Sequence, residues 1–250
     1  MEKAQARYPT MPTKRALRLE RKLRASGENT DDALTPASHV TMSGHRIKVS
    51  GAIWQLFDQE LLSTTCTVIP RSWELEPAEL EAFNPVERLN AFRTDLYRNG
   101  AALARGRLCA FIHGEFDPVA CVYRLHLHLA CSAEMVPVLD RLRALPNYHS
   151  TRFLPSGEVS PVYRRIWVRR KPLYNLPDPI TYLVQAFWPS RPIIITDDGR
   201  RVRRRQKQAI PEPFHSDVLL WLDRWELKDL TLLVGLRVTS AGLRPTRSQK

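Results

Sequence analysis

The clearest pattern in the chain is a strict alternation of hydrophobic and polar residues over positions 123–129. Leucines occupy positions 125, 127 and 129, and His126 and His128 lie between them. Because successive side chains of a β-strand point to opposite faces, this spacing predicts a strand over 119–131. Its leucines are expected to face the core, and both histidines are expected to share the opposite face.

Further strands and helices follow from the same kind of pattern. Strands are expected over 61–70, which is rich in β-branched residues and ends at a proline, and over 107–116, 161–170 and 192–196. A helix is expected over 85–99, with Asn84 as its N-cap and Gly100 at its exit. Shorter helices are expected over 14–25, 76–83, 132–145 and 178–187, the last two capped by Ser132 and Asp178.

The element order is therefore β-α-β-β-α-β-α, with the two middle strands joined by a short turn at Asp117-Pro118. It predicts an α+β fold in which an antiparallel sheet carries its helices on one face, the split-βαβ, ferredoxin-like arrangement. The other face is expected to be open for a site. Residues 214–225 and 227–234 look helical and amphipathic and predict a C-terminal helical extension.

This pattern divides the chain into three parts. Residues 1–44 form a basic, weakly ordered N-terminal arm, 45–197 the core domain, and 198–250 a basic linker with the helical extension. Hydrophobic residues make up 43% of the 250 residues, enough for a substantial core.

Charge narrows the range of partners. The net charge is +12, which favours a polyanion, with nucleic acid ahead of an anionic membrane surface. The charge is uneven: residues 1–26 hold eight Lys or Arg against two Glu, and 200–207 hold six, whereas 41–120 hold eight basic and ten acidic residues. Several basic runs outside a nearly neutral middle indicate a binding surface, although one run alone is usually a solvated face.

Other features point to a soluble protein of the cytoplasm. The sequence contains no apolar run long enough to span a membrane and no secretory signal at its start, so we expect no membrane partner. The four cysteines form no Cys-x-x-Cys pair and lie in apolar runs, which predicts buried, reduced thiols. The sequence does not indicate the oligomeric state.

His126 and His128 are the first candidates for chemistry. Two imidazoles leaving one strand face can chelate a divalent metal ion. Glu115, expected across the hairpin from the histidines, would add a carboxylate ligand, and His113 is a reserve ligand. The alternative is a pair of exposed histidines without a function.

At this point the chain resembles the HUH endonuclease superfamily of replication initiators, relaxases and related transposases. His126-Leu127-His128 satisfies the family's histidine-hydrophobic-histidine motif, and residues 64–70 loosely match its first motif. Glu115 precedes His126 by eleven residues, near the position of the family's carboxylate. Tyr182 lies where the family carries its tyrosine helix. The likeness spans roughly residues 60–190.

The resemblance implies a function. His126, His128 and Glu115 would hold Mg²⁺ or Mn²⁺, and Tyr182, with Tyr174 as a second candidate, would attack the scissile phosphate of single-stranded DNA at an origin. The result would be a 5′-phosphotyrosine link, as in replication initiators of bacteria, plasmids and other mobile genetic elements. Gln185 departs from the family, which often has lysine there, and Tyr182 is alternatively a packing residue of an amphipathic helix.

Basic and aromatic residues near the fourth strand are candidates for DNA contacts, and Trp167 or Tyr163 for stacking on a base. The candidates for contacts with the DNA backbone are Arg164, Arg165, Arg169, Arg170, Lys171, Arg200, Arg201, Arg203, Arg204, Arg205 and Lys207. Two other functions stay open: a non-catalytic nucleic-acid-binding protein that keeps the fold, and a basic scaffold whose arginine-rich ends bind RNA or a protein.

Overall fold

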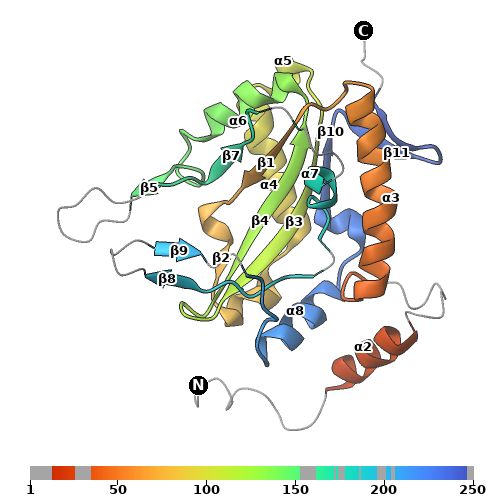
Figure 1. Cartoon of the computed structure of the whole chain (residues 1–250), viewed down its shortest axis with the longest axis vertical. Helices are drawn as coiled ribbons and strands as arrows, with labels where there is room; N and C mark the ends of the chain where they lie inside the picture. The colour runs from red at the N-terminus through yellow and green to blue at the C-terminus, as the bar shows by residue number, and fades with distance from the viewer. Residues whose placement is uncertain are drawn as a thin grey trace.

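A six-stranded antiparallel sheet forms the centre of the molecule (Figure 1). The structure is a computed structural model that describes residues 13–25, 35–152, 162–171, 173, 178–185, 187–195, 201–203 and 206–246. The strands lie in the order β10-β3-β4-β1-β7, and β2 pairs with β4. Their bounds are β1 Thr64–Val68, β2 Glu74–Leu75, β3 Leu108–Asp117, β4 Val122–Cys131, β7 Ile166–Val168 and β10 Thr231–Val234.

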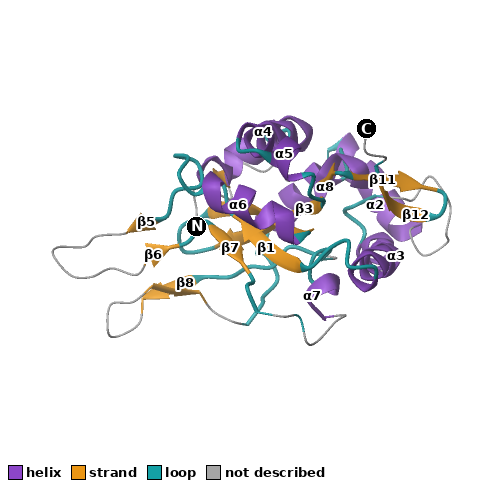
Figure 2. Ribbon diagram, turned by 90° about the horizontal axis from the view of Figure 1, so that it is seen from above, coloured by secondary structure: helices purple, strands orange, loops and turns teal. Residues whose placement is uncertain are grey.

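The strand order confirms the expected α+β architecture. Helix α4 (Pro85–Arg98) connects β1 to β3, and β4 lies between these two strands, which is the split-βαβ arrangement. The Asn84 side chain accepts hydrogen bonds from the first turn of α4, and Gly100 adopts a left-handed φ of 94° after the helix, as its sequence predicts. Helices α4 and α6 (Val136–Leu142) cover the leucine face of β4, where the larger hydrophobic core lies (Figure 2).

The other face of the sheet is partly covered, whereas we expected it to be open. Helix α3 (His39–Asp58) and the single turn α7 (Asp178–Thr181) lie there and enclose a second hydrophobic core. The sequence did not reveal α3, because Ile47 and Trp54 are exposed on its outer side and obscure the amphipathic period. The expected boundary between residues 44 and 45 therefore lies inside this helix and is wrong.

The basic segment before α3 is a docked helix. Helix α2 (Lys14–Ala25) has the bounds predicted for a short basic helix within the arm. It buries Leu19, and Lys22 Nζ lies 2.7 Å from the Asp223 carboxylate beside helix α8 (Phe214–Leu222). The rest of the expected arm, 1–12 and 26–34, lies outside the described residues.

The C-terminal part is not a helical extension. Helix α8 confirms the helix expected over 214–225, but the segment after it forms a short 3-10 helix (η5, Leu227–Leu230) and then β10, which pairs with β3. Leu232 and Val234 are buried at the two-residue spacing of a strand. Pairing with the edge of β3 therefore selects a strand where the sequence pattern had suggested a helix. The chain continues into a hairpin of β11 (Leu236–Thr239) and β12 (Gly242–Pro245).

Several elements are shorter than their patterns indicate. The 76–83 and 132–145 segments begin as 3-10 helices, and Ser132 Oγ accepts from the Arg107 amide instead of capping a helix. The segment 161–170 is interrupted, and α7 ends at Thr181, before the expected residue 187. The remaining elements are η2 Arg71–Trp73, η3 Pro77–Ala82, η4 Ala133–Met135, α5 Ala101–Ala104, β5 Thr151–Arg152, β6 Val162–Tyr163, β8 Ile193–Ile195 and β9 Arg201–Arg203.

The cysteines largely agree with the expectation of buried, reduced thiols. All four thiols are free. Burial raises the pKa of Cys109 and Cys131 to about 12 and raises that of Cys66 as well. Cys121 is the exception, since it is exposed in the connection between β3 and β4. Among the described residues, no helix is long and apolar enough to cross a membrane.

Candidate functional site

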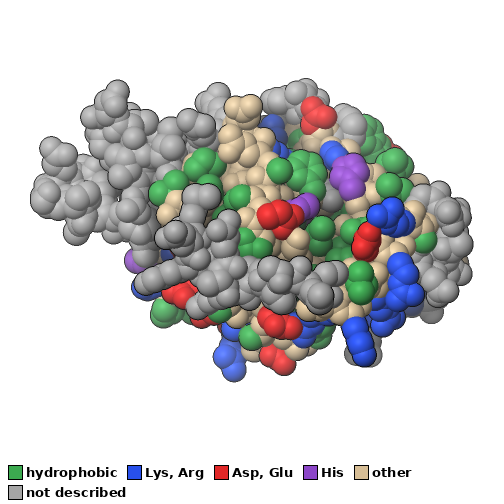
Figure 3. Space-filling view, turned by 90° about the horizontal axis from the view of Figure 1, so that it is seen from below, with side chains coloured by type: hydrophobic (Ala, Val, Ile, Leu, Met, Phe, Trp, Pro, Cys, Tyr) green, Lys and Arg blue, Asp and Glu red, His purple; other side chains and the backbone are tan. Residues whose placement is uncertain are grey.

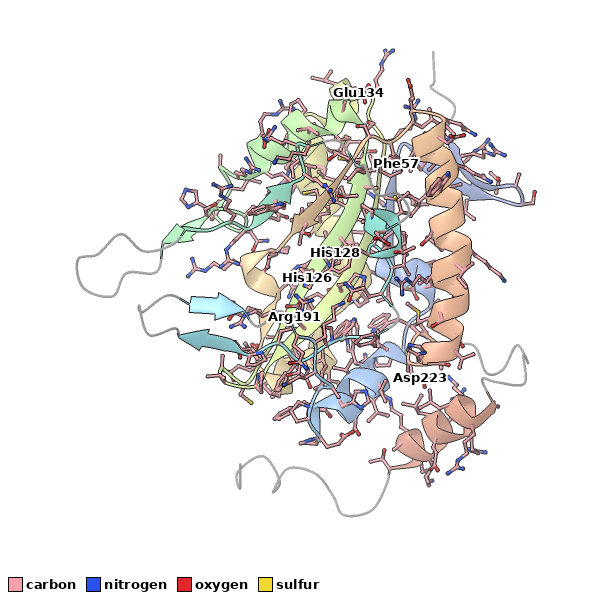
Figure 4. The ribbon with its side chains drawn as sticks, in the orientation of Figure 1. Phe57, His126, His128, Glu134, Arg191 and Asp223 are labelled. Atoms are coloured by element: carbon pink, nitrogen blue, oxygen red, sulfur yellow. The ribbon has the colours of Figure 1, made fainter. Side chains whose placement is uncertain are left out.

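His126 and His128 lie on the same face of β4, as the alternation predicts, and both are buried (Figure 4). Their Nε2 atoms are 3.1 Å apart. The rings meet edge to face, with centroids 4.7 Å apart. The strand therefore brings two imidazole nitrogens to one point on the sheet.

The second ring nitrogen of each histidine has its own partner. His126 Nδ1 is 3.2 Å from the Arg124 carbonyl oxygen, which can only accept, so Nδ1 carries a proton, and His126 Nε2 lies within hydrogen-bond distance of His128 Nε2. His128 Nδ1 is 3.1 Å from Thr67 Oγ1 of β1. Burial, then the nearby imidazoles and cations, lower the pKa of His128 far below its usual range, so this ring is neutral.

This donor pair fits a divalent metal ion. Two nitrogen ligands that are each about 2.1 Å from one ion lie roughly 3 Å apart when they are neighbours in its coordination shell. The 3.1 Å between the two Nε2 atoms matches that spacing, and a backbone carbonyl bound to Nδ1 is the usual support for a ligating histidine. Within the described parts of the chain, however, no three His, Cys, Asp or Glu side chains gather into a ligand set.

Glu115 does not lie where the sequence placed it. The connection between β3 and β4 covers 118–121, so Asp117 pairs with Val122 and Glu115 lies opposite Arg124. The residue opposite His126 is His113. The Glu115 carboxylate is buried and lies 3.4 Å from Arg191 Nη1, which reduces its availability as a metal ligand.

His113 is committed to the protein interior. Its Nε2 is 3.0 Å from the Leu183 carbonyl oxygen and 3.2 Å from the Gln185 amide nitrogen, and its ring centroid is 4.8 Å from that of His128. Burial, and then the charge of His126, lower the pKa of His113 to about 3. This histidine therefore joins the sheet to the segment after α7, and it remains neutral near neutral pH.

We expect stability to fall in mild acid because of His113. Its folded-state pKa of about 3 is below the 6.5 of a free imidazole, so the unfolded chain takes up a proton below about pH 6.5 that the folded chain excludes. The free energy of unfolding should decrease from pH 6.5 towards pH 3. Urea unfolding of His113→Leu should show a smaller loss than wild type over this range, and His215→Leu, at a half-buried residue of α8 outside the site, should show the wild-type loss. Equal losses in all three proteins would contradict the assignment.

Tyr182 meets the histidine pair from a distant part of the chain. It follows α7, which is anchored by buried Ile180 and Leu183 and by a 3.0 Å hydrogen bond from Arg46 Nε to the Thr181 carbonyl. The Tyr182 ring centroid is 4.7 Å from that of His128, and 40% of the residue is exposed. Tyr182 is thus not a core residue of an amphipathic helix. Tyr174 lies outside the described residues.

Lys207 brings a positive charge to Tyr182. Its neighbour Gln208 exchanges two backbone hydrogen bonds with Ser190. Ser190 in turn pairs with Phe116 near the end of β3. Lys207 Nζ lies 3.2 Å from Gln185 Oε1 and 5.2 Å from the Tyr182 ring centroid. Partial burial, and then Arg191, lower the pKa of Lys207. A lysine from a distant segment therefore lies next to Gln185, where the resemblance led us to expect one within the helix.

Arg191 and Thr67 also lie beside the histidine pair, and neither was expected there from the sequence. Arg191 lies near His126 and His128 in Figure 4, and its amide donates to the Phe116 carbonyl with a distance of 2.9 Å. No local pattern around Arg191 marks it. The pairing of β1 with β4 places Thr67 opposite His128, which a correct alignment of the two strands would have revealed.

The arginines near β7 divide into two groups. Arg165 is buried, which argues against the DNA contact expected of it, whereas Arg170 is exposed and its Nη2 lies 2.8 and 2.7 Å from the two carboxylate oxygens of Asp140. Arg164, Arg169 and Lys171 are exposed. Of the basic residues over 200–207, Arg201 and Arg203 belong to strand β9. Arg200, Arg204 and Arg205 lie outside the described residues.

Other basic side chains lie at the surface of the molecule. Figure 3 shows Lys and Arg on one side of the lower face, on the side of the molecule where α2 lies in Figure 1.

In comparisons with known proteins, no protein-family model, no curated protein and no solved structure matched the chain significantly.

Proposed function

We propose that this protein cleaves and rejoins single-stranded DNA, with the Tyr182 hydroxyl as the nucleophile. The observation that carries the proposal is the meeting of three segments far apart in sequence. The histidine pair comes from β4, Tyr182 follows α7, and Lys207 comes from the segment after β9. A pair of imidazoles, a partly exposed phenol and a cation within one site are the groups that phosphoryl transfer to tyrosine requires.

The chemistry assigns a role to each group. The Tyr182 oxygen forms a bond to phosphorus, the bond from phosphorus to the 3′ oxygen breaks, and the phenolic proton is lost while the 3′ oxygen gains one. The products are a 5′-phosphotyrosine and a free 3′ hydroxyl, and reversal of the step rejoins the strand. Lys207, 5.2 Å from the Tyr182 ring, offsets the negative charge that develops there.

His126 and His128 are the residues that would hold Mg²⁺ or Mn²⁺, through the Nε2 atoms whose 3.1 Å separation fits two ligands of one ion. When bound, the ion would polarise the scissile phosphate. Thr67 and the Arg124 carbonyl hold the two rings in orientation. Arg191 neutralises Glu115 and keeps a buried carboxylate from repelling the phosphate.

The direct test uses the full-length protein and labelled single-stranded oligonucleotides of varied sequence with Mn²⁺. A covalent adduct that survives a denaturing gel and disappears with EDTA is the expected result. Labelling the 5′ or the 3′ end decides which fragment stays on the protein, and the mechanism requires the fragment on the 3′ side of the nick. If no sequence yields an adduct under conditions in which the protein binds DNA, the proposed activity is wrong.

Replacing Lys207 should slow the reaction more than it weakens binding. We expect Lys207→Gln to reduce the rate of adduct formation by roughly 10²-fold to 10³-fold, which is the effect of removing one charge-stabilising group. The double variant Lys207→Gln with Gln185→Lys should recover part of the rate, because Gln185 Oε1 is 3.2 Å from the ammonium group. The exposed Lys171→Gln is the matched control. Equal losses of rate and of DNA affinity in Lys207→Gln would show that Lys207 only binds the DNA backbone.

A second candidate function is DNA binding without cleavage. The pairing of Glu115 with Arg191 favours it, because the expected carboxylate ligand is already neutralised. Under this alternative the protein retains single-stranded DNA in a salt-sensitive manner and forms no adduct with any metal ion.

A further inference from the structure

A groove leads from His128 across β1 to the edge strand β7. It has a volume of about 390 Å³, which is within the range of sites for small ligands. His128 and Tyr182 line one end, Thr65 and Thr67 line its floor, and Trp167 lines the far end. The nucleophile of the proposed reaction is therefore part of a cavity that extends beyond it.

Trp167 is exposed because of its place in the sheet. Its neighbours in β7, Ile166 and Val168, are buried on the core face, so Trp167 points to the histidine face and keeps 59% of its surface exposed. Trp167 pairs with Thr67, and Thr67 pairs with His128, which places the three residues in one row across the sheet. Two strand spacings separate Trp167 from His128, a distance of about 10 Å.

The remaining groups of the groove match the parts of a nucleotide. The threonine hydroxyls are neutral donors and acceptors, and the exposed Arg169 is a cation for a phosphate oxygen. Asp178 lies in the same lining and can accept from a base amino group, but it disfavours a second phosphate beside it. Arg164 Cζ is 5.6 Å from the Trp167 ring centroid, which adds positive charge at this edge.

We infer that this groove binds one nucleotide of the single-stranded substrate, next to the phosphate at Tyr182, with its base stacked on Trp167. The inference rests on the proposed function for the position of that phosphate. An exposed tryptophan alone would not indicate a nucleotide-binding site. The tryptophan closes a groove that begins at the candidate nucleophile, and an arginine and two threonines line the same cavity.

The test measures binding without cleavage. Affinity of the full-length protein for a labelled single-stranded oligonucleotide is measured in EDTA at fixed salt by fluorescence anisotropy. Because stacking of one base contributes about 1–3 kcal/mol, Trp167→Ala should weaken binding roughly 5-fold to 150-fold, and Trp167→Phe should retain most of the affinity. Trp54→Ala is the matched control, since Trp54 on α3 is 40% exposed and lies outside the groove. It should bind as wild type does.

Arg169→Gln and the choice of ligand sharpen the result. Arg169→Gln should lower the salt dependence of binding by about one phosphate contact. An oligonucleotide duplex of the same sequence should bind equally well to wild type and Trp167→Ala, because its bases are not available for stacking. RNA of the same sequence serves as a second ligand, and a Trp167 effect seen with RNA alone would overturn the assignment to DNA.

The outcomes separate this inference from the proposed function. Unchanged affinity of a folded Trp167→Ala, or an equal loss in Trp54→Ala, would overturn the nucleotide groove whether or not the protein nicks DNA. A specific loss in Trp167→Ala, without any adduct under catalytic conditions, would keep the groove and reject the nuclease. Failure of Trp167→Phe to retain affinity while its unfolding matches wild type would also count against stacking.

Discussion

Replacing Tyr182 by phenylalanine should abolish the covalent protein–DNA adduct and leave the affinity for single-stranded DNA within a factor of a few. The change removes one oxygen atom from a ring that is already 40% exposed and that lies edge to face against His128, so the fold has little reason to change. Loss of a nucleophile typically lowers the rate by at least about 10³-fold. The measurement is adduct formation on a denaturing gel, with DNA affinity determined in parallel.

Two other tyrosines make this result interpretable. Tyr97 on α4 is 47% exposed on the opposite side of the sheet, so Tyr97→Phe should form the adduct at the wild-type rate. Tyr174 was the second candidate in the sequence, and Tyr174→Phe tests it directly. An adduct in Tyr182→Phe that disappears only when Tyr174 is also replaced would move the nucleophile to Tyr174.

Replacing either histidine of the pair should remove metal binding. His126→Ala or His128→Ala leaves one imidazole where two Nε2 atoms now lie 3.1 Å apart, and a single imidazole holds a divalent ion weakly. Loss of the ion removes several kcal/mol of stabilisation from the transition state, so the adduct rate should fall by on the order of 10²-fold to 10³-fold. Binding of Mn²⁺ is measured by calorimetry and by broadening of histidine NMR signals.

The half-buried His215 on α8, which lies outside the site, provides the control for these variants. His215→Ala should bind Mn²⁺ as wild type does. Unchanged histidine signals in wild type during a metal titration would reject the metal site itself. A His128→Ala protein that binds Mn²⁺ normally would instead transfer the site to other ligands, of which His113 is the nearest imidazole, with its ring centroid 4.8 Å from that of His128.

The histidine pair shows how far local pattern reaches in this chain. Alternation over 123–129 was sufficient to predict the strand, the burial of its leucines and the shared face of His126 and His128, because the two-residue period of a strand is a local property. The helix over 85–99 was equally predictable, since Asn84 and Gly100 mark its two ends. The order of these elements also gave the split-βαβ sheet.

The failures have a different physical cause. Residues 227–234 have apolar positions that suit a helix as well as a strand, and only the unpaired edge of β3 made the strand the better solution. Helix α3 carries apolar residues on its exposed side, so its periodicity was weak. Glu115 was misplaced because the length of the hairpin connection, which the alternation does not fix, sets the register.

The sequence by itself determined which candidate side-chain groups are present, and the tertiary structure decided which of them meet. Two histidines on one strand face are a consequence of backbone geometry. The proximity of Tyr182, Lys207 and Arg191 to them depends on α7 packing beneath α3 and on the backbone pairing between Ser190 and Gln208. The hydrogen bond between Arg46 and Thr181 joins residues 135 positions apart in the chain, and long-range packing is not encoded in any local period.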